Sequence, residues 1–197
     1  LHTQDWGGSH FENGAQVAAG GRALVRGVYG SLLGRVSHGG VHAHSDQLCA
    51  LVELARREGM AEQTWIHAFT DGRDVSPTSA VHDLAELPDD RIATISGRYY
   101  AMDRDKRWER TQLTLDAIFH AGPGARREDT AVALVQKSYD GDVTDAFIVP
   151  FWRAGQPALH PSRDAVTCFN FRPDRMRPLA GKLGEPGVDV TTMTQYR

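Results

Sequence analysis

Seven residues that could hold an anion or move a proton lie in polar loops of this chain, each loop following a short apolar run. They are His42 in GGVHAH, Arg73 and Asp74 in DGRD, Arg98 and Arg104 in SGRYYAMDRD, and Arg172 and Arg175 in NFRPDR. Guanidinium groups match phosphate and carboxylate oxygens bidentately, and several of them together repel one another unless an anion joins them. A crevice holding these arginines would therefore take a small ligand with more than one negative charge.

Asp74 and His42 could carry the polar chemistry of such a site. An aspartate among arginines is ionised, and an ionised carboxylate beside a hydroxyl can act as a general base. Asp74 could equally orient Arg73 or cap a helix that begins near Ser76, and the residues alone do not separate these roles. We expect His42 to hydrogen-bond a phosphate or a hydroxyl, because an imidazole can donate at either nitrogen.

Two other interpretations of these residues stay open. His42 and His44, with His38 and Asp46 beside them, permit a divalent metal, but no clear third and fourth ligand follows elsewhere in the sequence. Each arginine taken alone could also be a surface residue in a local ion pair, although the shared position after strands favours a common ligand. We therefore predict no metal site in this chain.

The polar loops follow predicted strands, which places them at one edge of a sheet. Runs rich in β-formers predict strands at the end of 23–36 and over 64–70, 91–95, 146–149 and 165–171, with a hairpin-like turn at 155–156. Apolar spacing and caps predict helices from a Ser45 cap to Gly59, from Ser76-Pro77, across Trp108 to Phe119, over 131–139, and from the NFRPDR loop through Lys182. This alternation predicts an α/β layered domain with a largely parallel or mixed sheet flanked by helices. In such sheets the carboxyl ends of the strands form the ligand crevice, so the loops should converge.

Composition sets outer bounds on the class of protein. The 197 residues are 41% hydrophobic and 24% charged, and 22 basic against 25 acidic side chains give a net charge of −3. This balance argues against a protein that coats nucleic acid or an anionic membrane. The sequence has no run of about 18 apolar residues and no signal-peptide pattern, so we expect a cytoplasmic protein. Cys49 and Cys168 each sit in an apolar stretch, and we expect both to be reduced core residues.

The loop motifs also occur in an order that is recognisable. GGVHAH, DGRDVSPTSA, SGRYYAMDRDKRWER and FNFRPDR, in that order, resemble the cofactor-independent phosphoglycerate mutase family, and the similarity runs from about Phe11 to Tyr196. The resemblance implies an enzyme of two domains. One is phosphatase-like and holds two Mn²⁺ ions and a nucleophilic serine, and the other is an inserted phosphotransferase domain that binds the substrate. This chain resembles the inserted domain alone.

The resemblance assigns roles to the seven residues identified above. It implies that His42, Arg73, Asp74, Arg98, Arg104, Arg172 and Arg175 bind the substrate, with Asp74 moving protons at the glycerate hydroxyls. Two residues next to the GGVH motif depart from the family's usual pattern: His38 precedes the motif where Asp is common, and Ala43 follows it where Ser is usual. The implied reaction, part of glycolysis and gluconeogenesis, interconverts 3-phosphoglycerate and 2-phosphoglycerate: the substrate phosphorylates the serine, the bound glycerate reorients, and the phosphate returns to its other hydroxyl.

The domain organisation follows from the same resemblance. We expect 1–21 to be a segment near a hinge, 22–190 to be the substrate-binding domain, and 191–197 to be a linker returning to the metal domain of the same polypeptide. The chain begins at Leu1 without a Met, which favours a piece of a longer protein. Without the serine, the metal ligands and the phosphatase-side lysine, the chain alone should show no turnover and should need no cofactor of its own. The alternative is a free-standing, non-catalytic module that binds a small phosphorylated or phosphonate carboxylic acid.

Overall fold

A computed structural model of the chain describes residues 29–120, 124–125 and 129–196. The predictions for 1–21 and for the first part of the 23–36 run therefore lie outside the described residues. In the part of the chain that is described, no helix is long and apolar enough to cross a membrane.

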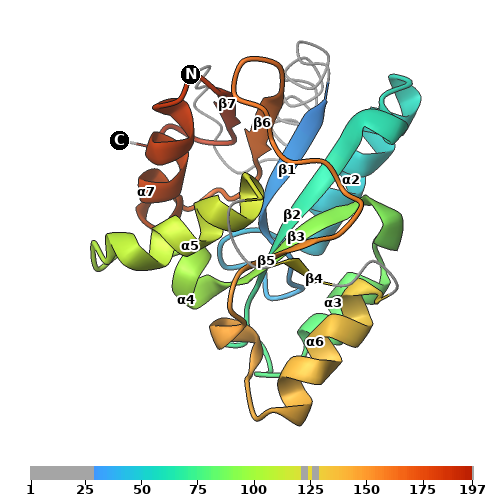
Figure 1. Ribbon diagram of the computed structural model, residues 1–197, viewed down its shortest axis with the longest axis vertical. Coiled ribbons are helices and arrows are strands. Elements are labelled where there is room, and N and C mark those ends of the chain that lie inside the picture. The colour runs from blue at the N-terminus through green and yellow to red at the C-terminus, as the bar shows by residue number, and fades with distance from the viewer. Residues whose placement is uncertain (1–28, 121–123, 126–128, 197) are drawn as a thin grey trace.

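The core of the fold is a mixed sheet in the order β4-β5-β3-β2-β1-β6-β7 (Figure 1). Its strands are β1 Gly30–Arg35, β2 Thr64–Thr70, β3 Ile92–Gly97, β4 Gly124–Ala125, β5 Phe151–Arg153, β6 Ala165–Cys168 and β7 Asp189–Thr192. The pairs β1–β2, β2–β3, β1–β6 and β6–β7 are parallel, whereas β5 runs antiparallel to β3 and carries β4 parallel to itself. The predicted α/β class with a largely parallel or mixed sheet is confirmed.

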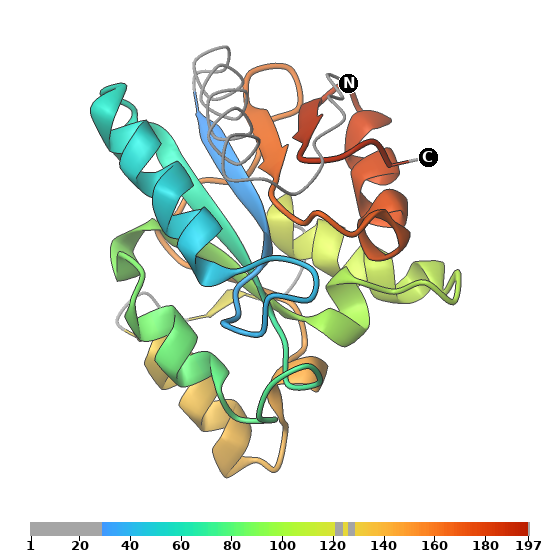
Figure 2. The ribbon, with the colours of Figure 1, turned by 180° about the vertical axis from the view of Figure 1, so that it is seen from behind.

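Helices cover both faces of this sheet, as the two opposite views show (Figures 1 and 2). They are α2 Ser45–Arg57, α3 Ala80–Ala85, α4 Arg98–Ala101, α5 Trp108–Ile118, α6 Ala131–Asp140 and α7 Pro173–Gly184. Apolar residues of α2, α3 and α6 pack in one buried cluster, and those of α4, α5 and α7 pack in another. Neighbouring residues of β1 separate accordingly, with Leu32 in the first cluster and Leu33 in the second, because successive strand residues face opposite sides. The result is a three-layer sandwich.

Two predicted helix starts are wrong, the first for a local reason and the second because of a distant contact. The cap of α2 is His44, whose Nδ1 accepts from the Asp46 amide at 3.2 Å while Gln47 accepts from the His44 amide at 2.9 Å, so Ser45 is already helical. Helix α3 begins at Ala80 rather than at Ser76-Pro77. The reason is a distant side chain: Asp145 Oδ2 accepts from the Ala80 amide at 3.0 Å, which satisfies the first turn there.

The predicted strand over 146–149 and the position of one cysteine are also wrong. Residues Asp145–Phe147 form a 3₁₀ turn, η3, and the strand comes later, as β5. The turn at 155–156 exists, with the Gln156 amide donating to the Arg153 carbonyl at 3.2 Å, but β5 pairs with β3 and β4, so no hairpin forms. Cys168 is buried as predicted, whereas Cys49 is exposed on α2; both are free thiols.

Candidate functional site

The crevice forms where the order of the strands reverses. From β1 the chain builds the sheet through β2 and β3 on one side and through β6 and β7 on the other. In open α/β sheets this reversal separates the loops at the carboxyl ends of the strands and leaves a ligand crevice between them. Two hydrogen bonds cross it here: Asn170 Oδ1 accepts from the Arg35 amide at 2.8 Å, and the His42 carbonyl accepts from the Phe171 amide at 2.8 Å. The loops after β1 and β6 are therefore held together.

A buried quartet of charges lies at the centre of this edge: Arg35, Asp71, Asp74 and Arg98. Arg35 Nη1 donates to Asp71 Oδ2 at 2.8 Å and to Asp74 Oδ2, while Arg98 Nη1 donates to Asp71 Oδ1 and, at 2.7 Å, to Asp74 Oδ2. The exposed fractions of the side chains are 0% for Arg35, 1% for Asp71 and 6% for Arg98, against 20% for Asp74. Two positive and two negative groups balance, which is what allows such charges to be buried.

The quartet keeps Asp74 ionised. Burial by itself would raise the pKa of Asp74, but the hydrogen bond and positive charge of Arg98 and the charge of Arg35 outweigh it and lower that pKa below its ordinary value. Arg35 responds in the opposite way, since burial lowers its pKa and the two aspartates only partly restore it. An Asp74 carboxylate that stays deprotonated is available to hydrogen-bond or to accept a proton.

His42 is buried against Arg98 and is neutral. Burial, followed by the charges of Arg35 and Arg98, lowers the pKa of His42 to about 4. Arg98 Nη2 lies 3.1 Å from His42 Nε2, and because a guanidinium only donates, Nε2 must be the acceptor and Nδ1 must carry the proton. His42 Nδ1 is buried with no hydrogen-bond partner in the described structure. The histidine thus offers one unsatisfied N–H donor at this edge of the sheet.

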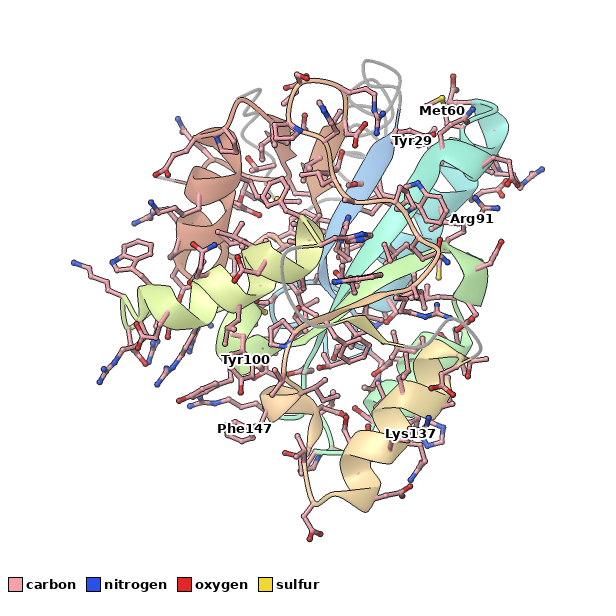
Figure 3. The ribbon with its side chains drawn as sticks, viewed as in Figure 1. Tyr29, Met60, Arg91, Tyr100, Lys137 and Phe147 are labelled. Atoms are coloured by element: carbon pink, nitrogen blue, oxygen red, sulfur yellow. The ribbon has the colours of Figure 1, made fainter. Side chains whose placement is uncertain are left out.

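A cavity of about 360 Å³ opens beside the quartet. Arg73, Arg98 and Arg175 line it together with Tyr99, Met102, Asp103, Arg110 and Phe147. Asp74 and His42 do not line it, and they reach it through Arg98. One wall is aromatic: the Tyr99 ring lies 5.1 Å from that of Phe147 and 5.2 Å from that of Tyr100, and Figure 3 shows Tyr100 and Phe147 on the same side of the molecule.

Two arginines that line this cavity, Arg73 and Arg175, and a third near Arg175, Arg104, have no carboxylate partner among the described residues. The side chains of Arg73 and Arg104 make no ion pair there, and Arg175 makes only a 3.4 Å hydrogen bond to the Met102 carbonyl. Arg175 Nε is buried without a partner. Burial, followed by the charges of Arg104 and Arg98, lowers the pKa of Arg175, which shows that these guanidiniums are close enough to repel one another.

Arg172, the last of the seven predicted residues, lies apart from this group. Its Nε donates to Asp174 Oδ1 at 2.8 Å at the start of α7, and its side chain is about half exposed. Its positive charge still contributes to the lowered pKa of His42. The structure therefore brings four of the seven residues, Arg73, Asp74, Arg98 and Arg175, to the quartet or its cavity. His42 contacts Arg98, Arg104 lies near Arg175, and Arg172 is in a local ion pair.

The loops that carry these residues need glycines at two positions. Gly72 in DGRD has φ +64°, and a Cβ there would lie 2.7 Å from the Asp145 Cβ. A Cβ on Gly97 in SGRYY would lie 2.5 Å from the Ala146 carbonyl oxygen. Both contacts are shorter than real carbon contacts, so only glycine lets the two loops pack against η3. The η3 turn thereby supports the loops after β2 and β3.

Sequence reasoning missed three residues of the site: Arg35, Asp71 and Asn170. Arg35 ends the apolar run GSLLGR, and an arginine at the end of an otherwise buried strand was the available signal. Asp71 Oδ1 accepts from the Arg73 and Asp74 amides at 3.3 and 3.2 Å, so it also shapes the DGRD turn. The expectation that five arginines share one anion needs revision, because Asp71 and Asp74 already compensate Arg98.

The residues described do not fit a metal ion. No group of three or more histidine, cysteine or acidic side chains in the described part of the chain is placed to hold one. His38 bonds Asp83 at 2.9 Å, His42 faces Arg98, and His44 caps α2, so the three histidines serve different partners. Asp71 and Asp74 lie against two guanidiniums, whose charge opposes a divalent cation.

Comparisons with known proteins show the family of the chain. Residues 8–197 match the family described as BPG-independent PGAM N-terminus. The chain is 47% identical over 193 residues to the 2,3-bisphosphoglycerate-independent phosphoglycerate mutase of Moorella thermoacetica, covering 93% of this chain and 37% of that protein. It is 42% identical to the enzyme of the same name from Haloarcula marismortui, covering 94% of this chain and 39% of that one.

A solved structure shows the same fold. A crystal structure of Leishmania mexicana phosphoglycerate mutase, determined at low cobalt concentration, superimposes with a TM-score of 0.76 at 23% identity, covering 93% of this chain and 41% of that one. The chain thus spans about two fifths of the length of the relatives it matches. On the family match across nearly its whole length, the chain belongs to the N-terminal family of the 2,3-bisphosphoglycerate-independent phosphoglycerate mutases.

Proposed function

We propose that this chain is the substrate-binding part of a phosphoglycerate mutase, an isomerase that interconverts 3-phosphoglycerate and 2-phosphoglycerate. The observation that carries the proposal is the excess of positive charge on the cavity lining, to which four arginines but only two aspartates, Asp103 and Asp105, contribute. Of these arginines, Arg73 and Arg175 have no carboxylate partner among the described residues. Both substrates carry a phosphate and a carboxylate, which together supply the missing negative charge. A cavity of about 360 Å³ suits a ligand of this size.

The arrangement supports a division of labour among the seven residues. The phosphate and the carboxylate are bound by Arg73, Arg98, Arg104 and Arg175. Arg172, at the start of α7, adds its positive charge. His42 contributes through Arg98, because its Nε2 accepts from Arg98 Nη2 and so orients that guanidinium toward the ligand. Asp74, deprotonated at neutral pH, accepts the proton of the glycerate hydroxyl as that oxygen takes the phosphoryl group, and it returns the proton when the reaction reverses.

The remainder of the mutase is part of the proposal. The phosphoserine intermediate and two Mn²⁺ ions belong to a separate phosphatase-like domain of the same polypeptide, outside this chain. Residues 22–190 form the substrate-binding domain, with 1–21 and 191–197 connecting it to the other domain. This chain alone binds substrate without turnover, and the reaction places it in glycolysis and gluconeogenesis in the cytoplasm.

A binding titration tests the proposal directly. The chain is titrated by calorimetry with 3-phosphoglycerate in metal-free buffer, with inorganic phosphate as the reference ligand. Arg175→Met removes one unmatched guanidinium, and because a charge-assisted hydrogen bond contributes about 1.5 to 3 kcal/mol, affinity should fall roughly 10- to 150-fold. Arg177→Met is the matched control, since Arg177 is exposed on the same helix and does not line the cavity.

The outcomes separate the alternatives. Saturable binding that prefers 3-phosphoglycerate over phosphate, weakened by Arg175→Met and not by Arg177→Met, supports the substrate-binding role. Equal or tighter binding of a phosphonate carboxylic acid would favour the non-catalytic binding module. If Arg175→Met binds as the unaltered chain does, the cavity is not the ligand site and the proposal fails.

A further inference from the structure

Arg35 is the most buried cation of the site, and neither the family motifs nor the cavity includes it. Its side chain is 0% exposed at the end of β1, and it does not line the cavity. Removing an arginine from water is costly unless its charge is paired and its donors are hydrogen-bonded, and of the Arg35 side-chain nitrogens Nε has no partner among the described residues. The contacts of Arg35 therefore indicate what it does.

Arg35 touches three of the polar loops at once. Its Nη1 donates to Asp71 and Asp74 in the loop after β2. Its Nη2 donates to the carbonyl oxygen of Ala43, the residue after His42, at 3.0 Å. Its backbone amide donates to Asn170 after β6 at 2.8 Å. A planar guanidinium fixes the directions of its hydrogen bonds, so the loops after β1 and β2 are held at a set distance from each other.

The position of Arg98 depends on the same contacts. Asp74 Oδ2 accepts from both Arg35 and Arg98, and the two carboxylates lie between the two guanidiniums. Without Arg35 two buried carboxylates would face a single guanidinium. Arg98 lines the cavity, and the two carboxylates that fix the direction of its side chain would then no longer be held in place. Asp74 would also lose one of its two hydrogen-bond donors.

We propose that Arg35 is a positioning residue: it does not touch the ligand, but it fixes Asp74 and Arg98 in the geometry that binds a phosphorylated carboxylic acid. The inference rests on the proposed function and deepens it, since it names a residue that affects ligand affinity without contacting the ligand. Loss of one charge-assisted hydrogen bond to a ligand lowers affinity by roughly 10- to 150-fold, so a displaced Arg98 should weaken binding measurably.

Arg153 provides a matched control for a purely structural arginine. It is also buried, and its guanidinium donates to Asp89 Oδ2 at 2.8 Å and to the Ile92 carbonyl at 3.1 Å. Ile92 begins β3, so Arg153 lies at the amino end of that strand, opposite the edge that carries the cavity. Arg153→Met should therefore lower the melting temperature without changing affinity.

The experiment compares Arg35→Met, Arg35→Lys and Arg153→Met with the unaltered chain. Calorimetric titration with 3-phosphoglycerate gives affinity, and ¹³C NMR of the Asp74 carboxyl, followed against pH without ligand, gives its pKa. We expect Arg35→Met to weaken binding by roughly 10- to 150-fold and to raise the pKa of Asp74. Arg35→Lys keeps the charge but not the planar fork, so its affinity should be intermediate.

The two readouts separate this inference from the proposed function. If the unaltered chain does not bind 3-phosphoglycerate, the proposed function fails, while the ligand-free titration of Asp74 still reports whether Arg35 holds that carboxylate. A folded Arg35→Met with unaltered affinity and an unaltered Asp74 titration overturns the inference. Should Arg35→Met not fold, Arg35→Lys decides in its place, and wild-type values in both measurements would overturn it.

Discussion

Arg98 shows how one side chain serves both the fold and the candidate site. It lines the cavity, yet its terminal nitrogens already donate to Asp71, Asp74 and His42. Its type and its place after a strand were readable in the sequence, and these features pointed to anion binding. Its partner Asp71, and the Arg35 that shares this carboxylate, could not be identified from the sequence, because contacts between residues 27 and 36 positions apart depend on which strands lie side by side.

Replacing Arg98 should therefore affect stability and binding together. Arg98→Ala leaves Asp71 and Asp74 with one guanidinium, and breaking a buried ion pair in this way typically destabilises by about 3 to 5 kcal/mol. Loss of its ligand contacts should also weaken binding of 3-phosphoglycerate by roughly 10- to 150-fold. Urea unfolding and calorimetry measure the two effects.

Arg57→Ala is the comparison for this variant. Arg57 is 71% exposed and pairs with Glu53 within α2, and surface pairs of this kind contribute about 0 to 1 kcal/mol. If Arg98→Ala costs no more stability than Arg57→Ala, the quartet is not a buried charge network.

At the scale of elements, the η3 turn is the support on which two of the loops rest. Its first residue, Asp145, accepts from the Ala80 amide through its side chain and from Thr70 Oγ1 through its carbonyl at 2.7 Å, and the Ile148 carbonyl accepts from the Gly97 amide at 2.8 Å. The apolar run that includes 146–149 resembles a strand in sequence. These non-local hydrogen bonds fold it into a turn instead, because they satisfy its backbone without a neighbouring strand.

Two glycine-to-alanine changes, one against η3 and one on an open helix surface, should have opposite effects on stability. Gly97→Ala forces a Cβ against the Ala146 backbone, and overpacking of this kind destabilises by about 1 to 3 kcal/mol. Gly181 lies in α7 with nothing within 4 Å of its Cβ position, so Gly181→Ala should stabilise by about 0.5 to 1 kcal/mol. Thermal unfolding of both variants measures the signs, and destabilisation by both would contradict the packing described.

At the scale of the whole molecule, two buried histidines couple the stability of the fold to pH. Burial lowers the pKa of His67 to about 3, with a smaller effect from His120, and burial together with Arg35 and Arg98 lowers the pKa of His42 to about 4. His67 lies inside the sheet, between Thr94 Oγ1 at 3.0 Å and Ser31 Oγ at 3.2 Å. Both histidines are therefore neutral in the folded protein and titrate near 6.5 in the unfolded chain.

The sign of the pH dependence follows from these values. Between about pH 4 and 6.5 the unfolded chain binds more protons than the folded protein, so stability is complete above about pH 6.5 and falls as the pH drops. Each histidine contributes a slope of at most about 1.4 kcal/mol per pH unit. The hydrogen bond to Asp83 raises the pKa of His38, so protonation of His38 stabilises the folded protein. This stabilisation is complete below pH 6.5 and is lost as the pH rises above 6.5.

A buried-histidine variant tests this prediction. Urea unfolding is measured from pH 4.5 to 6.5 for the unaltered chain and for His67→Gln, and the variant should show a smaller slope of stability against pH. The slope is compared rather than the absolute stability, because the substitution also changes packing. An unchanged slope would mean that His67 is protonated in the folded protein or accessible to water.

Local pattern alone determined the order of most elements and their class. The runs that became β1, β2, β3 and β6 are apolar and rich in β-formers, and α2, α5, α6 and α7 carry helical spacing or caps, so each could be assigned from neighbours a few residues away. Because parallel strands put their carboxyl ends at one edge, the same pattern placed His42, Arg73, Asp74 and Arg98 together. The motif resemblance identified the family.

Only the tertiary structure decided which charges pair and where the sheet reverses. The reversal between β1 and β6, the antiparallel direction of β5, and the contacts of Arg35 and Asp145 all join residues far apart in the chain. Such contacts depend on the final order of strands, and no periodicity within a segment encodes that order. A charge buried at the end of a strand, as in Arg35, is stable only when distant partners surround it, so its role becomes visible only once the sheet is assembled.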